Sequence, residues 1–219
     1  MSISLFAYHG QPELRQIVID HISHLASQGF RSNTTKGSDH TNGFLEALAD
    51  GSSDPAVAFQ KTGFPYPLLQ ICESIFKGLP TKQAAAFAIE LVQTAQIDAD
   101  ISDVAFHFLE WMIEDSLSTH GRSGLQFSAK DKGLVLAKLA QMQCDVSSAA
   151  IIKKLTRQAK RHDLPIPTSD EKFVLDALHL VLGGSSAGSA VDWIADLAPD
   201  PEAKYALFAR KLIELVKTA

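Results

Sequence analysis

The chain has 219 residues, of which 46% are hydrophobic and 21% are charged, and its formal net charge is −5. This composition excludes an intrinsically disordered chain, which would hold fewer apolar residues and more net charge. The acidic balance argues against a general binder of nucleic acid or anionic membranes, because both require a positive surface. No apolar run approaches the ~18 residues that span a bilayer, and no signal peptide is recognisable. We therefore expect a cytoplasmic protein without membrane association.

Apolar side chains return every three or four positions along most of the chain, which is the spacing of one face of an α-helix. The first such run begins at Pro12 and stops at Gly29, as helices commonly do. The predicted helices cover 12–28, 44–49, 68–79, 81–97, 103–117, 128–143, 147–161, 168–182, 190–197 and 201–217, and one more starts at Asp54-Pro55. We therefore predict an all-α fold, an irregular bundle of about eight to ten helices.

Capping residues separate these helices. Asp54-Pro55 and Asp200-Pro201 each place a capping carboxylate before a proline at the first helical position. Thr81 can cap the alanine-rich helix after it. The glycine-containing segment 118–127 is the best candidate for an internal boundary. The sequence therefore predicts an N-terminal helical region (1–120) and a C-terminal one (121–219), with one continuous domain as the alternative.

One block of the sequence resembles a known family. It consists of Gly63-Phe64-Pro65, Leu69, Glu73, Ile75-Phe76 and Gly78-Leu79-Pro80. This block is similar to the GIP…L…E…IFEGLP segment of an uncharacterised family of small bacterial proteins. The similarity continues from Ala99-Asp100 to Trp111 and covers about residues 63–117. The family has no known activity, so the resemblance implies an α-helical bacterial protein and assigns no site.

Two otherwise apolar helices each carry one narrow polar stripe. The stripes are Asp103, His107, Glu110 and Glu114 on one helix, and Lys172, Asp176 and His179 on the other. Imidazole and carboxylate groups on facing helices can share a metal ion, although the His-x-x-Glu order here is the reverse of the usual motif. One hypothesis is a metal-dependent helical enzyme that uses His107, Glu110, Asp176 and His179. The alternative is that each stripe is the solvent-exposed edge of its helix.

A basic stripe lies on the predicted helix 151–161. It comprises Lys153, Lys154, Arg157, Lys160 and Arg161. Five positive charges on one face could bind phosphates or an acidic partner, which makes a nucleic-acid-associated regulator a further alternative. Because no aromatic residues lie among these charges, a solvated face paired with acidic neighbours is the favoured interpretation.

Three weaker motifs complete the candidates. His21 and His24 share the first helix and have no evident third metal ligand, so we expect a hydrogen-bonded core or interface histidine. Ser186 lies in a Gly-x-Ser-x-Gly match at 184–188, but no histidine follows it to serve as a base, so a helix connector is expected. His162-Asp163 is a lone dyad without further ligands.

The sequence shows many apolar helix faces and no catalytic spacing. We therefore expect a non-enzymatic binding or interaction module of a bacterial cytoplasm. Homo-oligomerisation or a protein partner is expected, because several helices are apolar over more surface than one neighbour covers. The two cysteines, Cys72 and Cys144, lie far apart without metal-ligand spacing and are expected as free buried thiols.

Overall fold

The computed structural model describes residues 6–30, 43–120, 186–196 and 198–219, without the side chains of 113, 114 and 116–120. The predicted helices over 128–143, 147–161 and 168–182 lie outside these residues.

The described residues form an all-α fold, as the apolar spacing predicted. A short 3₁₀ turn, η1 (Ala7–Gly10), comes first. The α-helices are α1 (Pro12–Ser27), α2 (Phe44–Leu48), α3 (Pro55–Thr62), α4 (Tyr66–Gly78), α5 (Thr81–Thr94), α6 (Val104–His120), α10 (Ala187–Asp196) and α11 (Pro201–Thr218). Within the described residues, extended backbone pairs only in an isolated bridge between Phe6 and Asp100. None of the described helices is long and apolar enough to cross a membrane.

Aspartate and proline start the helices where the sequence predicted. α1, α3 and α11 each begin on a proline. Proline has no N–H, but the first N–H of a helix has no carbonyl partner within the helix, so no hydrogen bond is lost there. The Asp54 carboxylate accepts a hydrogen bond of 2.9 Å from the Ala56 N–H, and the Asp200 carboxylate accepts one of 3.0 Å from the Ala203 N–H. These caps satisfy first-turn amides that have no partner within the helix.

Three helix limits differ from the prediction by three residues, and α4 begins at Tyr66, two residues before the predicted start. α5 ends at Thr94 and not near residue 97, because the backbone at Ala95 is already extended. α6 runs to His120 and not to 117, so the first part of the expected boundary segment 118–127 is helical. No glycine or proline interrupts the chain before Gly121, which explains the extension. α10 begins at Ala187, three residues earlier than predicted.

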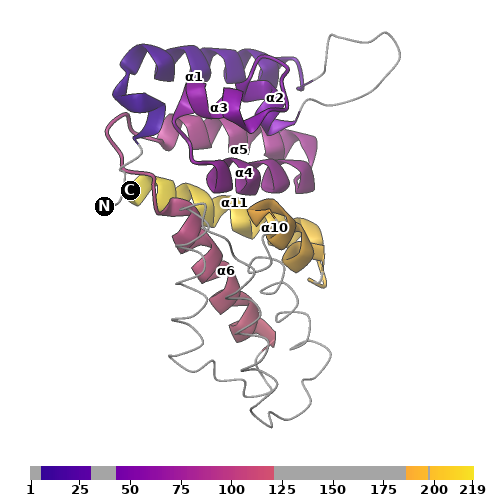
Figure 1. Cartoon of the computed structure of the whole chain (residues 1–219). Helices are drawn as coiled ribbons and strands as arrows, with labels where there is room; N and C mark the ends of the chain where they lie inside the picture. Colours follow the sequence, from indigo (N-terminus) through magenta and orange to yellow (C-terminus); the bar gives the residue numbers. More distant parts are fainter. Residues whose placement is uncertain (1–5, 31–42, 121–185, 197) are drawn as a thin grey trace.

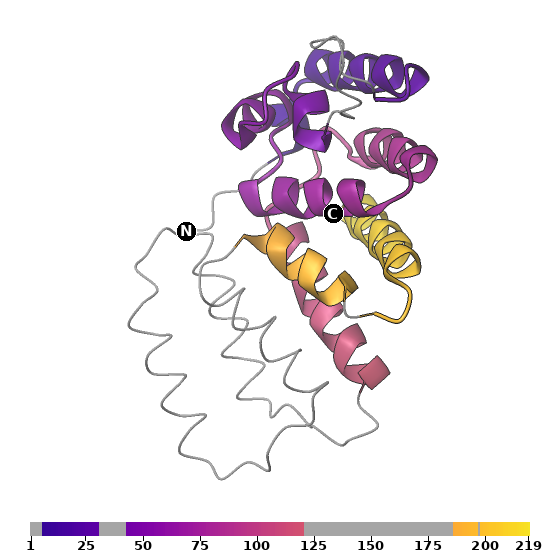
Figure 2. The same ribbon diagram turned by 90° about the vertical axis from the view of Figure 1, so that its right-hand side faces the viewer.

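α4 lies at the centre of the arrangement. It packs against α2, α3, α5, α6, α10 and α11. Figure 1 shows α1, α2 and α3 on one side of α4 and α5, with α10 and α11 on the other side and α6 extending away from them. Figure 2 shows the same succession of layers after a 90° turn. The described part of the molecule is therefore a stack of short helices built around α4.

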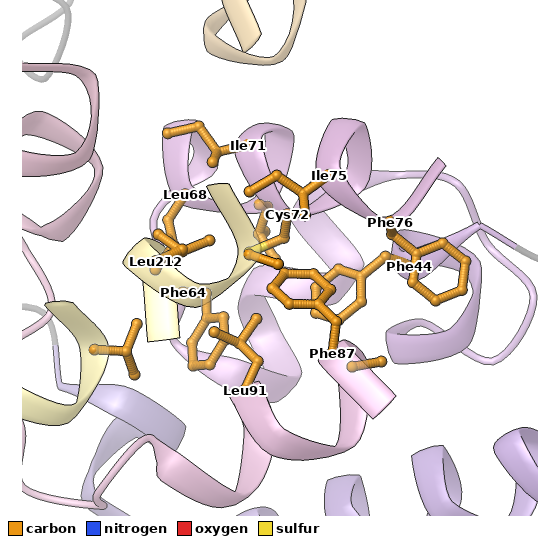
Figure 3. Packing of buried hydrophobic residues seen from close by; sticks show 14 of the residues in the cluster. Phe44, Phe64, Leu68, Ile71, Cys72, Ile75, Phe76, Phe87, Leu91 and Leu212 are labelled. Atoms are coloured by element: carbon orange, nitrogen blue, oxygen red, sulfur yellow. The ribbon is translucent and has the colours of Figure 1, made fainter. Parts of the chain in front are cut away.

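Helices from before residue 120 and after residue 186 share one apolar core. In Figure 3, Leu68 and Cys72 of α4 lie close to Phe87 and Leu91 of α5 and to Leu212 of α11. All five side chains are buried, and each fully buried leucine or phenylalanine contributes roughly 1.5–3 kcal/mol. α10 and α11 therefore complete the core of the N-terminal helices. The predicted division into two regions near residue 120 stays a prediction, because residues 121–185 lie outside the described part.

The N-terminal segment caps the end of α5. The Tyr8 hydroxyl donates a hydrogen bond of 2.6 Å to the Val92 carbonyl. The Arg15 guanidinium donates to the Gln93 carbonyl at 2.7 Å and to the Ala95 carbonyl at 3.2 Å. The last carbonyls of a helix lack partners within it, so these bonds satisfy groups that would otherwise need water. They also attach η1 and α1 to α5.

Candidate functional site

A pocket of about 250 Å³ opens between the end of α4 and the start of α5. It is lined by Phe30, Gly43, Phe76, Lys77, Leu79, Thr81 and Ala84. A dry cavity of about 150 Å³ can hold benzene, whereas pockets for drug-sized ligands measure about 300–1,000 Å³. The pocket therefore has room for one group about the size of a large side chain.

Aromatic rings form the floor of the pocket. The rings of Phe30 and Phe76 meet edge to face, with centroids 5.0 Å apart, and Phe44 lies 6.1 Å from Phe76 behind them. Figure 3 shows Phe44, Phe76 and Phe87 gathered at this end of the core. Phe30 and Phe76 are 1% and 6% exposed, so the core holds both rings firmly. Little of either ring is therefore accessible from the pocket.

The chain reversal after α1 brings Phe30 into the floor. Gly29 and Phe30 both adopt positive φ angles, 71° and 53°, and the Phe30 N–H donates to the Leu25 carbonyl at 2.9 Å. Glycine tolerates such a conformation, whereas phenylalanine adopts it at an energetic cost. Burial of the Phe30 ring against Phe76 offsets that cost.

Polar groups form the rim on the α4 side. The Lys77 ammonium pairs with the Glu73 carboxylate at 2.8 Å, one helical turn away. The other Glu73 oxygen accepts a hydrogen bond of 2.8 Å from the Leu45 N–H at the start of α2. A Cβ at Gly43 would overlap this carboxylate, so a larger residue there would make Glu73 shift. Glu73 therefore holds both α2 and Lys77 beside the pocket. Thr81, which was predicted to cap α5, is instead the first residue of that helix.

The surroundings of Lys77 are negative. The hydrogen bond to Glu73 raises the pKa of Lys77 the most, and the charges of Glu73, Asp192 and Glu46 raise it further against the opposing effect of burial. Lys77 remains 68% exposed at the rim. The ammonium is therefore charged at neutral pH, and carboxylates outnumber it locally.

A polar network joins α4, α10 and α11 next to this rim. The Asp192 carboxylate accepts hydrogen bonds from the Ser74 hydroxyl at 3.1 Å and from the Tyr205 hydroxyl at 3.0 Å. Burial raises the pKa of Asp192, and it also raises the pKa of Tyr205, to which the neighbouring Asp192 charge adds. Because both hydroxyls donate to one carboxylate, the network acts as a connection between three helices.

The sequence did not predict the pocket. Its lining residues come from four separated segments, and their convergence depends on how α1, α2, α4 and α5 pack. One signal was present in the sequence, because the block that resembles the bacterial family contains three residues of this site. Phe76 and Leu79 line the pocket, and Glu73 orders its rim.

The predicted metal stripe is described only on α6. His107 Nδ1 lies 3.7 Å from Glu110 Oε2, and their side chains are 56% and 35% exposed. Asp103 is also exposed. Asp176 and His179 lie outside the described residues, so the four-residue site stays a prediction. Within the described residues, no group of three or more His, Cys, Asp and Glu side chains could hold a metal ion.

The histidines of α1 lie at the surface rather than in the core. The His21 side chain is 36% exposed, and its Nε2 lies 3.7 Å from the Asp50 carboxylate. His24 Nε2 lies 2.9 Å from the Gln28 side-chain nitrogen. His21 follows Val18 on the helix, but its ring lies at the border of the apolar face, where it can reach an exposed carboxylate. Of the two expected positions, core or interface, the structure does not place His21 in the core, and the interface position stays a prediction.

Ser186 caps α10. Its hydroxyl oxygen accepts a hydrogen bond of 3.1 Å from the Ser189 N–H, which explains why the helix begins at Ala187. Of the predicted connector 184–188, residues 187 and 188 already belong to α10, and residues 184 and 185 lie outside the described part.

Two other candidate groups lie outside the described residues. These are the basic stripe of Lys153, Lys154, Arg157, Lys160 and Arg161, and the dyad His162-Asp163. Comparison of the chain with protein-family models, with curated proteins and with solved structures found no match.

Proposed function

We propose that this protein is a non-enzymatic interaction module whose pocket between α4 and α5 accepts one apolar side chain of a partner protein. The observation that supports the proposal is the size and lining of the pocket. Its volume of about 250 Å³ matches one anchor side chain better than a drug-sized ligand, and its lining combines the apolar Phe30, Phe76, Leu79 and Ala84 with Gly43, Lys77 and Thr81.

The rigidity of the pocket supports the same function. Its floor belongs to the buried core, and the Glu73 carboxylate holds the start of α2 and Lys77 in place. A pocket formed before binding saves the entropy cost of ordering side chains when the partner arrives.

The buried free thiol of Cys72 and the bacterial family resemblance support the further proposal of a reducing bacterial cytoplasm. A second copy of the chain would be one form of partner.

An NMR titration with indole tests the proposed function. Indole imitates a tryptophan side chain and fits the volume of the pocket. We expect chemical-shift changes at the amides of Phe30, Lys77, Thr81 and Ala84, which border the pocket. Amides of α11 far from the pocket, such as that of Val216, should not shift.

A matched pair of tryptophan variants locates the binding. Thr81 lines the pocket, whereas Gln83 is exposed on the same turn of α5 and does not line it. Thr81→Trp should fill the pocket and remove the indole-dependent shifts, and Gln83→Trp should leave them unchanged. Indole shifts that survive in Thr81→Trp, or that are absent in the unaltered protein, would show that the proposed function is wrong.

A further inference from the structure

We propose that the partner segment is basic, with one large apolar side chain for the pocket and lysine or arginine residues on either side of it. This inference rests on the proposed function and adds the charge of the partner. It follows from the ionisable groups around the pocket rim.

Among the described lining residues, Lys77 carries the ammonium, and several carboxylates lie near it. Glu73 pairs directly with Lys77 at 2.8 Å, and the charges of Asp192 and Glu46 act on the same ammonium. Asp196 lies one helical turn after Asp192 on α10, on the same side of the helix. These four acids therefore form one negative region beside the pocket.

The cations described near the pocket do not balance this region. Lys77 is already neutralised by Glu73, and the next lysine along the chain, Lys82, follows Thr81 on the exposed side of α5. Among the residues that the structure describes, four carboxylates thus lie near two ammonium groups, and the whole chain also carries a net charge of −5. A positive partner would be attracted both locally and over longer distances.

The excess carboxylates are accessible to a partner. Asp196 is exposed and Glu46 is partly exposed, whereas Glu73 is largely covered and serves α2 and Lys77. Flanking lysines of a bound segment could therefore approach Asp196 and Glu46 while the apolar side chain lies against Phe76. Charges at the edge of an interface mainly raise the association rate, so the effect should weaken as salt increases.

Three matched peptides test the inference. Each has a central tryptophan flanked on both sides by two lysines, two serines or two glutamates. Binding to the intact protein is measured by NMR titration at about 20 mM and about 300 mM salt, where screening differs strongly. The lysine peptide should bind about 3- to 10-fold more tightly than the serine peptide at low salt, and the glutamate peptide more weakly. The preference should shrink at high salt.

Charge-neutral variants show whether the rim causes the preference. Glu46→Gln keeps the contact with the Gly43 N–H, because glutamine also serves at this position of a helix start. Combined with Asp196→Asn, it should remove most of the preference for lysine. The control is Glu13→Gln with Asp98→Asn, which removes two exposed charges near the opposite end of α5. The control should keep the preference.

The outcomes separate the two proposals. Equal binding of the lysine and serine peptides at the pocket, or tighter binding of the glutamate peptide, would overturn the charge inference and leave the interaction function standing. If neither indole nor any peptide shifts the pocket amides, the interaction function itself is wrong. Loss of the lysine preference in the Glu13 and Asp98 control would also overturn the inference, because the rim would then not be its source.

Discussion

The aromatic ring of Tyr205 on α11 lies against the backbone of Gly78 at the end of α4, in the space that a side chain would need. Gly78→Ala should therefore force the ring away or move α11. Overpacking of this kind costs about 1–3 kcal/mol of unfolding free energy. Urea denaturation monitored by circular dichroism measures the change.

A double-mutant cycle with Tyr205→Leu tests the cause. If the ring is the obstacle, Gly78→Ala should be much less harmful once Tyr205 has been shortened. An equal loss of stability in both backgrounds would show that the alanine acts on the helix end alone.

The half-buried carboxylate of Asp192 makes the stability of the protein depend on pH. Burial raises its pKa in the folded state, so the folded protein holds the proton more tightly than the unfolded chain does. The contribution of Asp192 to stability should therefore be fully present below its unfolded pKa of about 3.9 and be lost as pH rises through the raised folded pKa. Asp192→Asn should remove this contribution, because an amide can still accept from Tyr205 and donate to Ser74.

The difference in unfolding free energy between the wild type and Asp192→Asn is the informative quantity. As pH rises from about 4 to the folded pKa of Asp192, the wild type should lose stability relative to the variant. At higher pH the difference in unfolding free energy should stay constant. A difference that is flat across this range, or that changes in favour of the wild type with rising pH, contradicts the assignment. Asp98→Asn, which changes an exposed carboxylate, is the control.

The Tyr8 hydroxyl attaches the N-terminal segment to α5. Tyr8→Phe removes its hydrogen bond to the buried Val92 carbonyl and should cost about 1–2 kcal/mol of unfolding free energy. Tyr66→Phe removes a hydroxyl from a side chain that is 55% exposed and should change stability by less than about 0.5 kcal/mol. Equal losses in the two variants would rule out a special role for the Tyr8 bond. Chemical denaturation is again the measurement.

The helices could be predicted because their signals are local. α3 and α11 begin where an aspartate precedes a proline, and the apolar positions of α1 and α4 repeat at helical spacing. The ends of helices were less predictable, because partners from elsewhere determine them. α5 ends where the Arg15 side chain reaches the Ala95 carbonyl, and no pattern within α5 reveals that contact.

The candidate site could not be predicted because it is a product of packing. Phe30 and Phe76 are far apart in the sequence, and each looks like an ordinary core residue. The sequence instead drew attention to histidines. Of these, His107 and His21 each lie near a carboxylate at the surface of the described residues. The types of residue in the sequence therefore pointed to polar pairs at the surface. The pocket could be found only once it was known which helices pack together.

The most direct test of the pocket is a crystal of the protein soaked with 5-bromoindole, in which the anomalous signal of bromine shows where the ring binds. The account predicts a bromine peak between α4 and α5, with the indole in contact with Phe76 and Leu79. Bromine peaks only at other places on the molecule, with the space beside Phe76 left without the ligand, would contradict the account.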